Sequence, residues 1–385
     1  MIKIKPTIEA STVFIQYNGS AALERPEHQG LSHLWEHLKC KTWFGNIKDF
    51  TRWGVSWNAF TSGTRVCYYM RGLNEGMKEL IGKYVLGPKH NVITYVPTEA
   101  EFNQERKVVL QEYDNAFADP EQALYVNIGR RTSGFSSAIG IRSVLENVTY
   151  KSFLDFMQHS NVDGSTIYTT PSFIHFVGDP KVAEAFSINN AVDDKFKFFK
   201  EINAVKHATG DMELPIECSS YTNNKVLIGD YIQVPNYKST LMDFLVALWS
   251  SGFDSPLVTE LRHKRSLTYS PSMFTDEPTP NIYFYVTTSP ENVATCRTVI
   301  RNMLADPSQF ITQERFDHVK TSLINAYDLS TKDNTNVNYV TNACNPFELN
   351  TETIKGFDYE KCLKLMSGWA DKIHHAQVGK EMVIE

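Results

Sequence analysis

Short β-rich segments, several of them with alternating hydrophobic and polar residues, mark the strands that the sequence predicts. They are residues 11–17, 55–61, 64–72, 168–177, 225–234 and 281–289. A period of two residues places successive side chains on opposite faces of a sheet, as expected for a half-buried strand. We therefore expect a strand at each of these segments.

Longer segments of good helix formers lie between the predicted strands. They are residues 30–42, 74–87, 98–122, 239–252, 256–266, 291–305 and 313–330. Thr98 and Glu101 form a capping box at the start of the third of these helices, which is the longest. Strands interleaved with helices of this length favour an α+β fold.

The order of predicted strands and helices is similar in the two halves of the chain. The sequence therefore predicts two structurally similar α+β domains, each a mostly antiparallel sheet with helices packed on one side. Residues 206–224 are rich in turn formers and predict the boundary between the halves. We expect domains at residues 1–205 and 206–385.

Composition and charge narrow the classes of function. The 385 residues carry a net charge of −6, which argues against a nucleic-acid binder that relies on neutralising phosphates. No apolar run approaches the roughly 20 residues of a membrane helix, and the N-terminus does not resemble a signal peptide. The six cysteines form no Cys-x-x-Cys pair, so we expect free thiols in a reducing compartment, the cytoplasm.

The sequence His33-Leu-Trp-Glu36-His37 is the strongest candidate for chemistry. In a helix, positions 33, 36 and 37 share one face, so the two imidazoles can bind one metal ion and the carboxylate can reach a metal-bound water. The spacing matches the inverted His-x-x-Glu-His pattern of zinc peptidases. The alternative is a helix whose polar face carries these residues by chance.

A catalytic zinc site needs a third protein ligand and an open fourth position. Glu105 and Glu112 are seven residues apart on the predicted long helix and therefore share a face. Either carboxylate could complete the site. The alternative for both is a solvated, charged helix face, which is the usual environment of glutamate.

Taken together, these motifs resemble the pitrilysin/insulinase family, and the resemblance covers most of the chain. Members have a third-ligand glutamate about 75 residues after His-x-x-Glu-His, and here 75 positions separate His37 from Glu112. The resemblance implies one Zn²⁺ per chain, held by His33, His37 and Glu112. It implies Glu36 as the general base, and Glu105 as a supporting acidic residue that orients one of the histidines.

The resemblance also implies residues that bind substrate. Asn58-Ala59-Phe-Thr resembles the family's strand whose free edge holds an extended peptide by main-chain hydrogen bonds. Arg262 and Tyr269 match the family's Arg-x-x-x-x-Leu-x-Tyr segment, in which an arginine holds a peptide carbonyl and a tyrosine stabilises an oxyanion. Without the resemblance, Asn58 is an ordinary turn residue and Arg262 part of a basic surface helix end.

The expected activity is that of a zinc metalloendopeptidase acting on peptides or unfolded segments inside a chamber. Residues 1–205 would be the catalytic domain, and residues 206–385 would carry the Arg/Tyr segment. The length resembles that of mitochondrial processing peptidase subunits, which implies a homodimer in which Arg262 and Tyr269 act on the partner's zinc site; a heterodimer is the alternative. The rival function is a non-catalytic binding or assembly subunit. Lys39 and Cys40 depart from the apolar residues that relatives usually have after the motif.

Overall fold

The structure is a computed structural model, in which the chain forms two compact units. Unit 1 contains the described residues up to 113, those from 137 to 185 and residues 330–331, and unit 2 contains residues 114–133, 224–329 and 351–384. The described residues are 9–17, 21, 24–63, 65–87, 92–93, 95–133, 137–158, 173–185, 224–234, 239–276, 281–331 and 351–384.

Unit 1 is built on an antiparallel sheet with the strand order β2-β3-β1-β4. Its strands are β1 (Ala10–Tyr17), β2 (Ser56–Thr61), β3 (Val66–Leu73) and β4 (Phe173–Val177). All of β1 is buried, whereas β2 is at one edge of the sheet. The strands predicted at residues 11–17, 55–61 and 64–72 are confirmed. Only residues 173–177 of the strand predicted at 168–177 are among the described residues, and they form β4.

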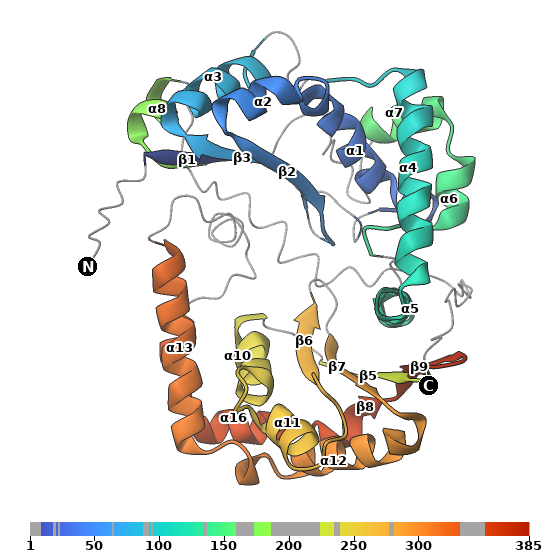
Figure 1. Ribbon diagram of the computed structural model, residues 1–385, viewed down its shortest axis with the longest axis vertical. Helices are drawn as coiled ribbons and strands as arrows, with labels where there is room; N and C mark the ends of the chain where they lie inside the picture. Colours follow the sequence, from blue (N-terminus) through green and yellow to red (C-terminus); the bar gives the residue numbers. More distant parts are fainter. Residues whose placement is uncertain are drawn as a thin grey trace. The chain divides into compact units, whose positions relative to one another are not determined.

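The helices of unit 1 contact this sheet through α1 and α3 (Figure 1). They are η2 (Pro26–His28), α1 (Leu31–Phe44), α2 (Ile47–Trp53), α3 (Asn74–Tyr84), α4 (Glu99–Ala118), α6 (Arg142–Asn147), α7 (Tyr150–Gln158) and α8 (Pro180–Ala185). Trp35 of α1 makes edge-to-face contacts with Tyr17 of β1 and Tyr68 of β3. Because these three side chains are fully buried, they fix α1 against the sheet.

The long helix predicted at residues 98–122 is two helices. The capping box is confirmed, since the Thr98 backbone N–H donates to Glu101 Oε2 at 2.8 Å. However, α4 ends at Ala118, and a new helix, α5 (Pro120–Ser133), begins at Pro120. Asp119 Oδ1 accepts the N–H groups of Glu121 and Gln122, and proline suits a first helical position because no N–H is needed there. The Asp-Pro pair therefore starts a helix inside the segment predicted to be continuous.

Unit 2 has an antiparallel sheet with the order β10-β9-β5-β7-β6, and β8 also pairs with β5. Its strands are β5 (Val226–Gln233), β6 (Ser272–Asp276), β7 (Asn281–Thr288), β8 (Ile373–His374), β9 (Ala376–Val378) and β10 (Met382–Ile384). The predicted strands at 225–234 and 281–289 are confirmed as β5 and β7. The sequence pattern missed β6 and the C-terminal strands, which are at most five residues long.

Most helices of unit 2 share one core with one face of the sheet. They are α10 (Ser239–Ser250), α11 (Pro256–Val258), the π-helical turn η4 (Thr259–His263), η5 (Pro290–Asn292), α12 (Val293–Ala305), η6 (Pro307–Gln309), α13 (Gln313–Thr331), α15 (Thr351–Lys355), α16 (Tyr359–Met366) and η7 (Ala370–Lys372). Ile228 and Phe284 of the sheet pack with Trp249 of α10 and Ile300 of α12. This arrangement follows from the period of two along β5 and β7.

Helix α5 belongs to unit 2 and covers the other face of its sheet. Leu124 and Ile128 pack with Leu227, Tyr231 and Tyr283, which alternate with the residues that face α10 and α12. The predicted fold class, two α+β domains with antiparallel sheets, is confirmed. The division into domains 1–205 and 206–385 stays a prediction, and it does not describe the packing of α5 in unit 2.

No helix in the described part of the chain combines the length and the apolar character that are needed to cross a bilayer.

Candidate metal centre

Helix α1 presents His33, Glu36 and His37 from adjacent turns. The segment contains good helix formers and no proline, and it ends at Gly45, whose N–H donates to the Lys41 carbonyl. At the other end Gly30 adopts φ +102°, a left-handed conformation that favours glycine. A Cβ at Gly30 would lie 3.0 Å from the Cα of Gly140. The helix therefore begins where backbone packing leaves no room for a side chain.

Helix α4 brings the carboxylates of Glu105 and Glu112 to this face of α1. The order in which they contact the histidines shows that the two helices run antiparallel. Glu112 Oε2 lies 3.5 Å from His33 Nε2 and 3.4 Å from His37 Nε2. Glu105 Oε2 lies 3.4 Å from His37 Nδ1. Glu112 thus meets both histidines, while Glu105 meets the far side of one of them.

The three donor atoms of His33, His37 and Glu112 have a spacing that suits one zinc ion. They all lie within 4.8 Å of one another. Tetrahedral zinc with bonds of about 2.0 Å separates neighbouring ligand atoms by about 3.3 Å, close to the two nitrogen-to-oxygen distances above. Two imidazoles and one carboxylate also form a common donor set for catalytic zinc. Among the described residues, no other group of three His, Cys, Asp or Glu side chains has this spacing.

The charges of these groups depend strongly on one another. Burial, with the neighbouring His37, lowers the pKa of His33 to about 4. Burial also lowers the pKa of His37, but the hydrogen bond to Glu112 and the nearby carboxylates outweigh it and leave this pKa raised. The same hydrogen bond lowers the pKa of Glu112. A neutral His33 and an ionised Glu112 are the forms that bind a metal cation.

Glu36 lies beside the three candidate ligands and is buried. Burial raises the pKa of its carboxyl group, against the effect of a hydrogen bond from Thr61. Thr61 Oγ1 donates to Glu36 Oε2 at 2.6 Å from β2. A carboxylate with a raised pKa and one oxygen fixed by a hydroxyl is suited to accept and return a proton near neutral pH.

Thr61 and Lys41 also contact the residues of this site, although neither was predicted from the sequence. Lys41 Nζ lies 2.7 Å from Glu105 Oε1. A signal for Lys41 was present in the sequence, because it follows His37 by four residues and therefore shares its helix face. Thr61 could have been recognised because it ends the segment Asn58–Thr61, which was predicted to bind substrate.

A pocket with a volume of about 1000 Å³ opens beside Glu36 and His37. Its lining includes Glu105, Glu112, Asn58 and Ala59. Much of the remaining lining is apolar and comes from the end of α1, from α2, and from β2 with the residue before it: Phe44, Ile47, Phe50, Val55 and Trp57. The structure therefore brings the predicted strand residues to the same pocket as the candidate ligands.

The edge of β2 has one donor already engaged. The backbone N–H of Ala59 donates to the side-chain oxygen of Asn58 at 2.9 Å. Asn58 therefore contacts the backbone of the strand segment that was predicted to bind a peptide.

Arg262 and Tyr269 lie together in unit 2. The Arg262 guanidinium is 4.2 Å from the centre of the Tyr269 ring and 5.8 Å from that of Phe253. The Tyr269 side chain remains 77% exposed. The two predicted residues thus form one exposed cation–π pair.

Comparisons with known proteins agree with the motifs. The family model described as "Insulinase (Peptidase family M16)" matches residues 1–136, and that described as "Peptidase M16 inactive domain" matches residues 228–323. Over 219 residues the chain is 24% identical to "Uncharacterized zinc protease YmxG" of Bacillus subtilis. This match covers 54% of the chain and 49% of YmxG, about half the length of that relative.

Solved structures share the fold over nearly the whole chain. A protease from Helicobacter pylori superposes with a TM-score of 0.68 at 16% identity, over 96% of this chain and 94% of that one. A protein described as a peptidase M16 inactive domain, from Pseudomonas fluorescens, superposes with a TM-score of 0.67 at 14% identity, over 98% and 95%. At these identities the likeness shows the fold.

Proposed function

The chain belongs to the pitrilysin/insulinase family of peptidases, and from this premise we propose that it is a zinc-dependent endopeptidase. Its substrates would be peptides or unfolded segments of proteins. The observation that carries the proposal is the convergence of His33 Nε2, His37 Nε2 and Glu112 Oε2, with Glu36 beside them.

His33, His37 and Glu112 would hold one Zn²⁺, which when bound supplies a Lewis acid that activates water and polarises a carbonyl group. Glu36 accepts the proton of the attacking water and delivers it to the leaving amine. The hydroxyl of Thr61 holds one oxygen of Glu36 during both transfers. Glu105 Oε2, 3.4 Å from His37 Nδ1, would accept the N–H of that nitrogen, so that Nε2 carries the free lone pair.

The pocket supports the binding of an extended peptide. β2 is the edge strand of the sheet, and its residues Asn58 and Ala59 line the pocket next to Glu36. Main-chain hydrogen bonds to this edge would align the scissile bond while tolerating many side-chain sequences. The net charge of −6 gives no support to nucleic-acid binding, which relies on a surplus of basic residues.

The non-catalytic subunit is the second candidate function, because the matched model for residues 228–323 is described as inactive. That segment belongs to unit 2, where the described residues include no trio with metal-ligand spacing. The candidate ligands and Glu36 all lie within the segment that matches the insulinase model. The enzyme is therefore the better supported of the two.

The change Glu36→Gln tests the proposed function. Cleavage of an internally quenched fluorescent peptide should fall by about 10²- to 10⁴-fold, because amide nitrogen cannot serve as the base. Zinc content, measured by mass spectrometry of the metals in purified protein, should stay at one per chain, because Glu36 is not one of the three ligands. Cleavage at the wild-type rate would refute the mechanism, and zinc-loaded wild type without cleavage would favour the binding subunit.

The predicted homodimer, in which Arg262 and Tyr269 act on the partner's zinc site, can be tested by mixing variants. Glu36→Gln and Arg262→Ala chains should each be inactive alone. In randomly mixed dimers, about a quarter of the sites would combine an intact Glu36 with an intact Arg262, and activity should return to that level. No recovery, together with a monomer in sedimentation, would reject the homodimer, and recovery only with another protein would favour a heterodimer.

The cytoplasmic assignment is also part of the proposal. Cys40, Cys67, Cys296 and Cys362 are free thiols, which supports a reducing compartment. Cys218 and Cys344 lie outside the described residues.

A further inference from the structure

Lys41 extends the line of charged side chains along α1 by one turn beyond the candidate metal ligands. His33, His37 and Lys41 follow at intervals of four residues and therefore lie along one face of the helix. Because α4 runs antiparallel to α1, its residues meet this face in reverse order. Glu112 meets His33 and His37, whereas Glu105 lies between His37 and Lys41.

The carboxylate of Glu105 has a separate partner for each oxygen. Oε1 is 2.7 Å from Lys41 Nζ, and Oε2 is 3.4 Å from His37 Nδ1. Lys41 Nζ also donates to Gln104 Oε1 at 3.3 Å. The side chains of Glu105 and Lys41 are only 13% and 22% exposed, so solvent competes weakly for these contacts.

We propose that Lys41 is a positioning residue that fixes the rotamer of Glu105, so that Oε2 receives the Nδ1–H of His37 and His37 Nε2 points at the metal site. The proposal rests on the proposed function, since it concerns the same site. A glutamate side chain has three rotatable bonds, and the contact with Nζ restricts them through the oxygen that His37 does not use. Partners that orient a metal-binding imidazole raise metal affinity about 10- to 100-fold.

Positioning and simple electrostatics predict opposite signs for the loss of Lys41. A cation near a Zn²⁺ site repels the ion, so removing its charge should by itself strengthen zinc binding. If Lys41 instead positions Glu105, its removal should weaken zinc binding, because His37 loses its orienting acceptor. The sign of the change in zinc affinity therefore separates the two roles without any measurement of peptidase activity.

The test is the zinc dissociation constant of the metal-free full chain, measured by competition with a chromogenic chelator at fixed pH. Lys41→Met should weaken zinc binding about tenfold, and Lys41→Arg should restore most of the affinity because a guanidinium can also reach the carboxylate. Lys107→Met, at an exposed position of α4, is the matched control and should leave the affinity unchanged or slightly increased. Unchanged or tighter binding by Lys41→Met would overturn the proposal.

A double-mutant cycle gives a second, independent outcome. If Lys41 acts only through Glu105, then Lys41→Met should cause no further loss of zinc affinity in a Glu105→Gln background. Independent losses that add would overturn the positioning role, even where Lys41→Met alone weakens binding by perturbing the fold. If the wild type binds no zinc, the proposed function fails together with this inference. If the wild type binds zinc and Lys41→Met binds it equally well, only the inference fails.

Discussion

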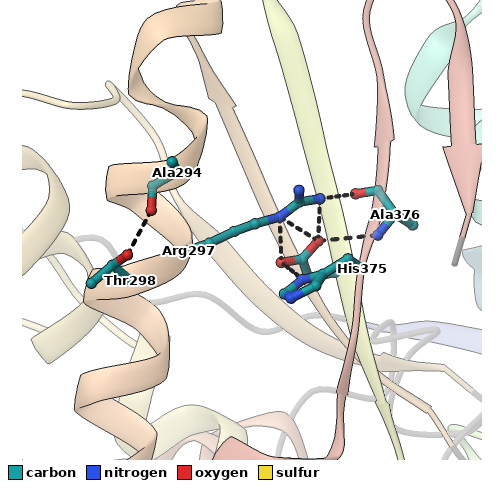
Figure 2. A network of polar contacts seen from close by, with 6 residues as sticks. Ala294, Arg297, Thr298, His375 and Ala376 are labelled. Carbon is teal, nitrogen blue, oxygen red and sulfur yellow. Dashed lines mark hydrogen bonds and ion pairs between the residues drawn. The ribbon is translucent and has the colours of Figure 1, made fainter.

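Each unit contains a cluster of buried polar groups. The two clusters differ in how completely these groups are hydrogen-bonded and paired with opposite charges. In unit 2, Asp230 is buried in β5 and receives hydrogen bonds from Arg297 of α12, from His375 Nδ1 and from the Ala376 backbone. Figure 2 shows Arg297 reaching from its helix towards His375 and Ala376. The network thus joins two strands of the sheet to a helix.

The cluster in unit 1 is only partly paired, although Glu112 contacts both histidines and Glu105 contacts His37 and Lys41. His33 and His37 lie 4.8 Å apart between ring centres, and His33 Nδ1 is buried without a hydrogen-bond partner among the described residues. Burial raises the pKa of Glu36 and lowers that of His33. Buried groups whose pKa values are shifted in opposite directions are typical of functional sites. A carboxylate with all its hydrogen-bond partners is typical of a structural site.

Replacing a carboxylate by its amide should therefore change the free energy of unfolding by a different amount at each position. The largest change is expected at Asp230. Asp230→Asn leaves Arg297 without its buried counter-ion and should lower the free energy of unfolding by about 3–5 kcal/mol. Chemical denaturation followed by circular dichroism measures this loss. Zinc affinity should not change, because the network belongs to unit 2.

An exposed pair of the same type is the control. Asp371 lies 3.6 Å from Arg301, and the side chains of both are largely exposed. Asp371→Asn should change the free energy of unfolding by less than about 1 kcal/mol. Equal losses from Asp230→Asn and Asp371→Asn would show that the buried network has no special structural role.

Glu24 lies between these two cases, because its buried carboxylate is hydrogen-bonded to Gly30 and Ser32 rather than paired with an arginine. It is buried ahead of α1, and its carboxylate accepts the N–H groups of Gly30 and Ser32 at 2.8 and 2.6 Å. Burial outweighs these bonds and raises its pKa from 4.5 to about 7. The folded state therefore binds the proton more tightly than the unfolded state does. The stability that results is fully present below pH 4.5 and is lost as the pH rises to about 7.

The pH dependence of Glu24→Gln tests this sign. Between pH 4.5 and 7 the free energy of unfolding of the wild type should fall relative to that of the variant, by an amount on the order of 2 kcal/mol. Denaturation curves at several pH values measure the difference, and any constant effect of the substitution cancels. A difference that stays constant with pH would mean that Glu24 titrates near its ordinary pKa.

The sequence was informative where a motif and a periodic pattern coincided. The helical spacing of His33, Glu36 and His37 predicted their shared face, and the main strands followed from apolar segments. The choice between Glu105 and Glu112 could not be made from spacing, because residues seven apart share a face equally well. It depends on how α4 lies against α1, which only tertiary packing determines.

Other contacts could not be predicted from the pattern of residue types, and the reasons are physical. The contact of Thr61 with Glu36 joins a strand to a helix 25 positions away. Lys39 looked like a departure from an apolar position, but its whole side chain is buried, burial lowers its pKa to about 7, and its terminal nitrogen donates to the Ile93 carbonyl. A long side chain can bury its carbons and still satisfy its charged end, which residue-type patterns do not reveal.

The smallest expected change in the free energy of unfolding is that of Glu36→Gln, and its sign is opposite to that of Asp230→Asn. In metal-free protein, Glu36→Gln should leave the free energy of unfolding unchanged or raise it by about 0.5–1 kcal/mol, because it removes a carboxylate whose burial is unfavourable enough to raise its pKa. The remaining side-chain oxygen can still accept the Thr61 hydroxyl, so that donor keeps its partner. Denaturation in the presence of a chelator, beside Asp230→Asn, measures both changes under one condition. A loss as large as that of Asp230→Asn would mean that Glu36 is held in place for stability, and the contrast between the two clusters would disappear.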